Sequence, residues 1–163
     1  LAKALGANVT GVCSTSKLDL VRGIGADRVV DYTREDYLDG SSAYDLILDI
    51  GGRNPVAQIR RALTPAGALG IVGGEDGGRL TGGMGRQLGA LATSPLHGHT
   101  IKNLIQQEHY SHFERLAEHL QSGAVVPAIE RTIGLSGVAD ALRDLGAGRV
   151  RGKIAVSVHG DER

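Results

Sequence analysis

Aromatic and sulfur-containing residues are scarce in this sequence. Only 3% of its 163 residues are aromatic, and it contains one cysteine, Cys13, and one methionine. A single cysteine excludes both a disulfide framework and a cysteine-based zinc site built within the chain. The hydrophobic fraction of 41% is nevertheless enough for an ordinary globular core, which must then be mainly aliphatic.

An excess of charge and a long apolar run are also lacking. Eighteen Lys and Arg residues balance eighteen Asp and Glu residues. A general binder of nucleic acids or anionic membranes needs a basic surface, and a membrane helix needs roughly 18 apolar residues in succession. We therefore expect a cytoplasmic protein with a small-molecule substrate and no nucleic-acid or membrane partner. The chain begins at Leu1, and its only methionine is Met84, so we expect a segment upstream of Leu1 to be missing.

Short apolar runs alternate with helix-like stretches along the chain. Such alternation is typical of parallel βαβ units, whose strands are buried on both faces. We read the glycine-rich residues 73–89 as mostly loop. The strands are expected at residues 8–12, 28–31, 43–50, 68–72 and 153–158, and the helices at residues 16–24, 55–63, 111–122 and 138–145.

Polar or glycine-rich residues follow the expected strands. In an open α/β sheet, ligands bind outside the carboxyl ends of the strands, and a crevice with a few convergent polar groups is the usual binding site. A tight turn is the simplest explanation for any one glycine pair. Because several strand ends share this character, we favour one ligand crevice built from residues 13–17, 31–33, 49–52 and 72–74.

The stretch after the first expected strand is the most informative. A dinucleotide-binding fold carries an Asp or Glu near this position when it binds the ribose 2′-hydroxyl of NAD. Cys13, Ser14 and Thr15 stand here instead, and Lys17 follows. Hydroxyls, free helix N–H groups and a lysine suit a 2′-phosphate. The alternative is a serine cap with a solvated lysine, which this stretch alone slightly favours.

Other polar residues carry weaker signals. Tyr32 follows the next strand, where its hydroxyl could bind phosphate or its ring could cover a strand end. The histidines at positions 97, 99, 109 and 112 fit no zinc-binding spacing, so we expect no metal. Cys13 is expected to be a small buried or strand-end residue, because no neighbouring base is identifiable to make it a nucleophile.

Several segments, in order, resemble the medium-chain dehydrogenase/reductase superfamily. They include VCSTSKLDLVRGIGADRVVDYTRED, YDLILDIGG, LTPAGALGIVGG and GVADALRDLGAGRVRGKIAVSV. The resemblance covers nearly the whole chain, and it is closest to the zinc-independent quinone-oxidoreductase branch. It implies that Lys17 and Tyr32 contact the 2′-phosphate of NADPH, together with Ser14. It further places Ile50 and Gly51 along the cofactor, and Val72 and Gly73 near the nicotinamide.

The resemblance also implies a fold and a domain organisation. We expect an α/β protein with a Rossmann-like, doubly wound parallel sheet that lacks its first strand. Residues 1–124 would form a partial NAD(P)-binding domain, and residues 125–163 would pack with a catalytic GroES-like domain that lies upstream. The glycine fingerprint for the pyrophosphate and most zinc ligands of the zinc-dependent branch would also lie upstream.

The function implied is hydride transfer from NADPH to a quinone or enone. We name no catalytic acid or base, we expect the 163-residue chain alone to be inactive, and we expect a homodimer of the full-length protein. Two alternatives remain within the superfamily, namely an NADPH-binding protein without turnover and a zinc-dependent alcohol dehydrogenase. An S-adenosylmethionine-dependent methyltransferase is disfavoured. Such an enzyme would need an acidic residue to bind the ribose, and residues 13–16 contain none.

Overall fold

The computed structural model describes residues 1–51, 54–72, 98–104 and 109–158. The chain divides into two compact units. Unit 1 consists of Leu1–Glu35 and His109–Arg163, and unit 2 is Asp36–Glu108. The described residues contain no helix long and apolar enough to cross a membrane.

Unit 1 begins with a βαβ element. Strand β1 (Thr10–Cys13) leads through a 3₁₀ turn, η1 (Thr15–Lys17), into helix α1 (Leu18–Gly23), and strand β2 (Arg28–Asp31) returns parallel to β1. The helix ends before Gly25, whose φ of +99° suits glycine alone. We expected one helix over residues 16–24, and the structure instead forms its first turn as a 3₁₀ helix.

Gly11 explains how α1 packs on β1. A Cβ atom built on Gly11 would collide with the Cγ1 methyl of Val21 on α1. The glycine that weakens the strand pattern in the sequence therefore lets the helix approach the strand closely.

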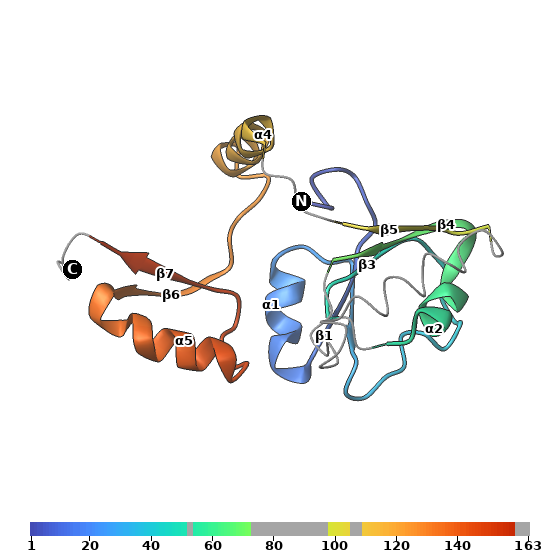
Figure 1. The fold of residues 1–163 in the computed structure, drawn as a ribbon, viewed down its shortest axis with the longest axis horizontal. Coiled ribbons are helices and arrows are strands. Elements are labelled where there is room, and N and C mark those ends of the chain that lie inside the picture. The colour runs from blue at the N-terminus through green and yellow to red at the C-terminus, as the bar shows by residue number, and fades with distance from the viewer. Residues whose placement is uncertain (52–53, 73–97, 105–108, 159–163) are drawn as a thin grey trace. The chain divides into compact units, whose positions relative to one another are not determined.

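A second βαβ element completes the regular structure of unit 1. Strand β6 (Ile129–Gly134), turn η3 (Leu135–Gly137), helix α5 (Val138–Gly146) and strand β7 (Lys153–Ser157) follow in order, and β6 pairs parallel with β7. In Figure 1, α5 lies alongside this strand pair. The sequence predicted α5 and β7, and it missed β6.

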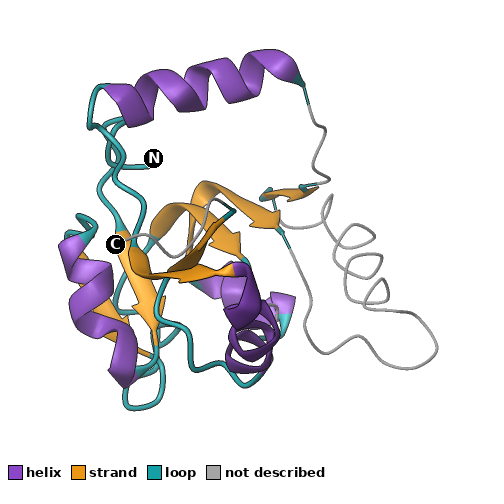
Figure 2. Cartoon of the chain, turned by 90° about the vertical axis from the view of Figure 1, so that its left-hand side faces the viewer, coloured by secondary structure: helices purple, strands orange, loops and turns teal. Residues whose placement is uncertain are grey.

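Helix α4 (Tyr110–Gln121) also belongs to unit 1 and forms one uninterrupted helix (Figure 2). The ring of His109 caps it by accepting a hydrogen bond from the Ser111 N–H at 3.4 Å. Gly123 follows its end with a φ of +72°. The predicted helix over residues 111–122 is confirmed, although its apolar side chains remain exposed.

Unit 2 is a three-stranded parallel sheet with one helix. The strands β3 (Tyr44–Asp49), β4 (Leu63–Ile71) and β5 (Thr100–Asn103) lie in the order β3-β4-β5, and helix α2 (Val56–Arg61) connects β3 to β4. Figure 1 shows the three strands side by side with α2 beside them. The core is aliphatic, as the composition predicted. It is formed by Ile59, Leu63, Leu69, Ile71 and Ile101.

The boundary between α2 and β4 differs from our prediction. We expected a helix over residues 55–63, whereas the helix ends at Arg61 and Leu63 opens the strand. Leu63 pairs with Tyr44 and is buried, so sheet pairing overrides the helical pattern there. The predicted loop at residues 73–89 lies outside the described residues.

The parallel pairings confirm the predicted α/β class. Strands β1 and β2 pair as the second and third strands of the order 3-2-1-4-5-6 should, and β3, β4 and β5 pair as its fourth, fifth and sixth. The expected first strand has no counterpart among the described residues.

Candidate functional site

The carboxyl ends of β1 and β2 lie side by side in unit 1. Cys13 is in register with Asp31, and the Tyr32 N–H donates a hydrogen bond to the Cys13 carbonyl at 3.2 Å. The segment after β1 carries Ser14, Thr15 and Lys17, and the segment after β2 carries Tyr32. Four of the predicted site residues therefore lie on two adjoining segments at one edge of the strand pair.

Asp31 connects these two segments. Its carboxylate accepts the Thr15 hydroxyl at 2.5 Å on Oδ2, and the Thr33 hydroxyl at 2.6 Å on Oδ1. The Thr33 backbone N–H also donates to Oδ1 at 3.0 Å, and Nε of Arg34 lies 3.8 Å from Oδ2. Three hydrogen bonds and a cation therefore compensate a carboxylate that is almost completely buried.

This arrangement keeps Asp31 ionised. The hydroxyls of Thr15 and Thr33 lower the pKa of the carboxyl below its ordinary value, and the nearby Arg34 acts in the same direction against the effect of burial. Asp31 therefore carries a fixed negative charge that is hydrogen-bonded to both segments.

Thr15 is engaged differently from our expectation. Its hydroxyl carries one hydrogen, which it donates to Asp31, and its oxygen lies 3.1 Å from the Thr33 hydroxyl. This hydroxyl therefore has no hydrogen left for a phosphate oxygen in this conformation. Any donation from Thr15 to an anion would have to come from its backbone N–H.

Lys17 and Tyr32 keep their polar atoms available. Within the described parts of the chain, neither the Lys17 ammonium nor the Tyr32 hydroxyl forms a hydrogen bond or an ion pair. Lys17 is half-buried, and Tyr32 is 45% exposed. Ser14 is also half-buried, and its hydroxyl lies 3.4 Å from that of Ser16. These side chains can supply a cation and hydroxyl donors to an anionic ligand.

Cys13 is buried at the end of β1, as the sequence predicted. Burial raises the pKa of its thiol, and the neighbouring Asp31 raises it further. A thiol held in its neutral form is a poor nucleophile.

The second group of predicted residues lies in unit 2. Ile50 and Gly51 follow β3 and are exposed, and Val72 follows β4 and is 45% exposed. The Val72 N–H donates to the Asp49 carbonyl at 3.0 Å, which holds these two strand ends together. Gly73 lies outside the described residues. Exposed apolar side chains at the ends of parallel strands suit a flat, uncharged part of a ligand.

Comparison with known proteins identifies the family. Residues 24–156 match the zinc-binding dehydrogenase family. The chain belongs to this family. The match confirms the resemblance to medium-chain dehydrogenases/reductases, with the chain corresponding to one part of their length.

Individual relatives agree with this assignment. The chain is 33% identical to the mitochondrial NAD(P)H oxidoreductase RTN4IP1 of Mus musculus, covering 96% of this chain and 43% of that protein. It is 26% identical to the trans-enoyl reductase pgmF of Aspergillus terreus, covering 97% and 47%. The chain therefore spans about half the length of the curated relatives it matches.

A solved structure shares the fold. The quinone oxidoreductase of Coxiella burnetii superposes with a TM-score of 0.77 at 23% identity, covering 97% of this chain and 47% of that one. At 23% identity, this likeness shows that the two proteins share a fold.

The family name refers to zinc, but the described residues carry no recognisable ligand set. No group of three or more His, Cys, Asp or Glu side chains in residues 1–51, 54–72, 98–104 and 109–158 could hold a metal ion. His109 caps α4, and its ring lies 5.8 Å from that of His112. His97 lies outside these ranges.

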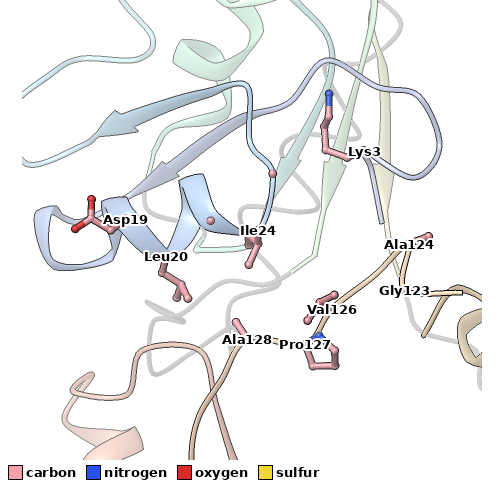
Figure 3. Close-up of a pocket in the computed structure, with 11 residues that line it drawn as sticks. Lys3, Asp19, Leu20, Ile24, Gly123, Ala124, Val126, Pro127 and Ala128 are labelled. Atoms are coloured by element: carbon pink, nitrogen blue, oxygen red, sulfur yellow. The ribbon is translucent and has the colours of Figure 1, made fainter. Parts of the chain in front are cut away.

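Unit 1 of this family member also contains a cavity of about 620 Å³ (Figure 3). Leu20 of α1 and Ile24, which follows the helix, face the segment formed by Val126, Pro127 and Ala128. Lys3 also lines the cavity, and its ammonium forms an ion pair with Asp27. The two charged residues that line this cavity, Lys3 and Asp19, are paired with Asp27 and Arg22, so it is not the better candidate for the functional site.

Sequence analysis included residues 31–33 in the expected crevice but gave Asp31 and Thr33 no role, and it left Arg34 out. The spacing Asp-X-Thr directly after a strand is a local signal that was available, since an aspartate often accepts a hydrogen bond from the backbone two residues on.

Proposed function

We propose that this chain is the cofactor-binding part of an NADPH-dependent oxidoreductase that reduces a quinone or enone. The observation that carries the proposal is the pair of unengaged donors, Lys17 and Tyr32, at the carboxyl ends of adjoining parallel strands. Parallel α/β sheets bind dinucleotides at this edge. The family membership and the relatives named as oxidoreductases support the same class of reaction.

The residues present fit a 2′-phosphate better than a ribose hydroxyl. The Lys17 ammonium can form a charge-assisted hydrogen bond with a phosphate oxygen, and the Tyr32 hydroxyl can donate a second. Among the described residues, the carboxylate at this edge that could accept from a ribose 2′-hydroxyl is Asp31, and it is almost completely buried and already accepts three hydrogen bonds. We therefore assign NADPH as the cofactor.

Each group of residues has its own part in binding. Ser14, Lys17 and Tyr32 would hold the 2′-phosphate, with Thr15 contributing its backbone N–H. Ile50, Gly51, Val72 and Gly73 would contact less polar portions of the cofactor. The bound NADPH would supply a hydride to the substrate. This chain would contribute binding and orientation, and we assign no proton transfer to its residues.

The cofactor assignment is tested by removing the cation. In the native protein, Lys17→Ala should weaken NADPH binding by about ten- to a hundredfold, since a hydrogen bond to a charged group contributes about 1.5–3 kcal/mol. NADH binding should stay nearly unchanged. Titration of both cofactors measures the two effects.

A matched control separates this effect from a general change of charge. Lys153→Ala removes an exposed lysine from β7 of the same unit and should leave both affinities unaltered. Equal losses of NADH and NADPH affinity in Lys17→Ala would exclude the 2′-phosphate assignment.

The reaction class is tested separately. NADPH oxidation should depend on an added quinone or enone when the native protein is assayed against a panel of both. Stoichiometric NADPH binding without turnover on that panel would favour a binding protein instead. Stoichiometric zinc, whose removal abolishes turnover, would place the protein in the zinc-dependent branch.

A further inference from the structure

Asp31 is a buried charge that cofactor binding itself does not use. Its side chain is only 4% exposed, and a buried carboxylate is costly unless hydrogen bonds replace its lost water. The replacement comes from two different segments. The Thr15 hydroxyl reaches it from the segment after β1, and Thr33 reaches it twice from the segment after β2.

These two segments also carry the two available donors. Lys17 follows Thr15 by two residues within the same 3₁₀ turn, and Tyr32 lies between Asp31 and Thr33. The carboxylate therefore fixes one segment on each of its oxygens. Loosening these bonds would leave the backbone hydrogen bond from Tyr32 to Cys13 as the remaining link near the site, and Lys17 and Tyr32 would be held less firmly relative to each other.

We propose that Asp31 is the positioning residue of the 2′-phosphate site, acting through Thr15 and Thr33 to hold Lys17 and Tyr32 in place. This inference rests on the proposed function, because it concerns the same site. Asp31 does not touch the phosphate. It organises the groups that do, so the cofactor meets donors whose geometry is already set.

The charge of Asp31 would by itself oppose a phosphate. The three hydrogen bonds and the Arg34 side chain, 3.8 Å away, compensate that charge. Positioning and repulsion predict opposite results when the charge is removed. Loss of positioning weakens phosphate binding, whereas relief of repulsion strengthens it.

The test compares two probes in the native protein, 2′,5′-ADP and 5′-AMP, which differ only in the 2′-phosphate. In Asp31→Asn, the affinity for 2′,5′-ADP should fall about fivefold or more, as expected within one hydrogen-bond network. The affinity for 5′-AMP should change less than about twofold.

The matched control is Asp27→Asn at the opposite end of the same strand pair. Asp27 accepts hydrogen bonds from the Val9 N–H at 2.7 Å and from Lys3 at 2.8 Å. Its replacement can affect stability but should leave the ratio of the two affinities unchanged. A purely structural role of Asp31 would make the two variants behave alike.

A second pair of variants keeps the charge of Asp31. Thr33→Val removes a hydroxyl donor to Asp31, and Thr33→Ser retains it. The valine variant should lose preference for 2′,5′-ADP in the same direction as Asp31→Asn, and the serine variant should restore it. This pair decides the question even if Asp31→Asn fails to fold.

The possible failures are distinguishable. If Lys17→Ala loses the preference for 2′,5′-ADP while Asp31→Asn and Thr33→Val keep or increase it, the positioning role is overturned and the proposed cofactor stands. If the unmodified protein binds both probes equally, both the proposed function and the positioning role are overturned.

Discussion

At the scale of single residues, the ionisation of Asp31 links this site to acid stability. Hydrogen bonds hold its pKa below its usual value of about 3.9 in an unfolded chain. A group with a lowered pKa stabilises the folded state above the unfolded value, and this contribution is lost as the pH falls through the folded value.

We therefore predict a pH-dependent difference between the native protein and its Asp31→Asn variant. The native protein should be more stable by a constant margin between pH 5 and pH 7, and the margin should shrink below about pH 4, where Asp31 takes up a proton. Urea unfolding at a series of pH values measures it. A margin that stays constant or widens below pH 4 would contradict the assigned pKa direction.

The sequence identified the available donors of the site but not what holds them. Lys17 and Tyr32 lie shortly beyond the ends of two expected strands, which is a local signal, and the family resemblance implies a phosphate contact for both. The bond between Thr15 and Asp31 joins residues 16 positions apart. It follows from the register of β1 with β2, and a one-residue change in that register would have moved Asp31 to the opposite face.

At the scale of elements, β6 shows why a strand can escape sequence analysis. Arg131 lies midway between Ile129 and Ile133 in the sequence of the strand, which breaks the apolar alternation. In the structure, its guanidinium binds the Asp144 carboxylate of α5 at 2.6 Å. A partner distant in sequence therefore makes the charged residue compatible with the strand.

Strand β5 was missed for a different reason. It has four residues, of which only Ile101 is buried. So short a run carries no periodic pattern, and its pairing with β4 alone defines it. Helices α4 and α5 were predicted well because each has a clear apolar face and is followed by a glycine with positive φ.

The turn before β7 requires glycine more strictly than the turn after α5. Gly152 has a φ of +98°, and a Cβ there would press on the Ala128 carbonyl oxygen, which accepts a hydrogen bond from the Lys153 N–H at 2.8 Å. Gly148 has a φ of +68°, and a Cβ there would meet no atom within 4 Å.

We predict that Gly152→Ala is the more destabilising of the two substitutions. Gly148→Ala should cost about 1–2 kcal/mol for backbone strain alone. Gly152→Ala should cost about 3 kcal/mol or more, because strain and collision add. The free energies of unfolding in urea compare them, and equal costs would show that the collision with Ala128 is relieved without penalty.

The core of unit 2 gives a second prediction at this scale. Ile59 of α2 is 2% exposed and packs against Leu69, Ile71 and Ile101. Ile59→Ala should cost about 2–5 kcal/mol, and the graded control Ile59→Val about 0.5–1.5 kcal/mol. Unfolding in urea measures both, and similar small costs would mean that this cluster does not support the unit.

At the scale of the whole molecule, the described residues leave much apolar surface exposed to solvent. Within the described residues, two of the three sheets have two strands each, and such pairs are marginal by themselves in water. Many large apolar side chains of the described residues are more than half exposed. They include Leu46, Leu48, Ile50, Phe113, Leu142 and Leu145.

We predict that residues 1–163 expressed alone do not form a stable monomer that binds NADPH. They should melt without a cooperative transition and bind a dye specific for exposed apolar surface. Calorimetry and dye fluorescence test this. A cooperative melt with stoichiometric NADPH binding by the monomeric chain would refute the prediction.

The division of the chain also has a consequence for the order of folding during translation. Unit 2 is continuous in sequence, whereas unit 1 is interrupted by it. Proteins emerge from the ribosome N-terminus first and fold unit by unit. All of Asp36–Glu108 is therefore synthesised before the second half of unit 1 begins at His109. Leu1–Glu35 leaves the ribosome before unit 2 but completes its own unit after it, so this segment is exposed to chaperones and proteases for longer than unit 2 is.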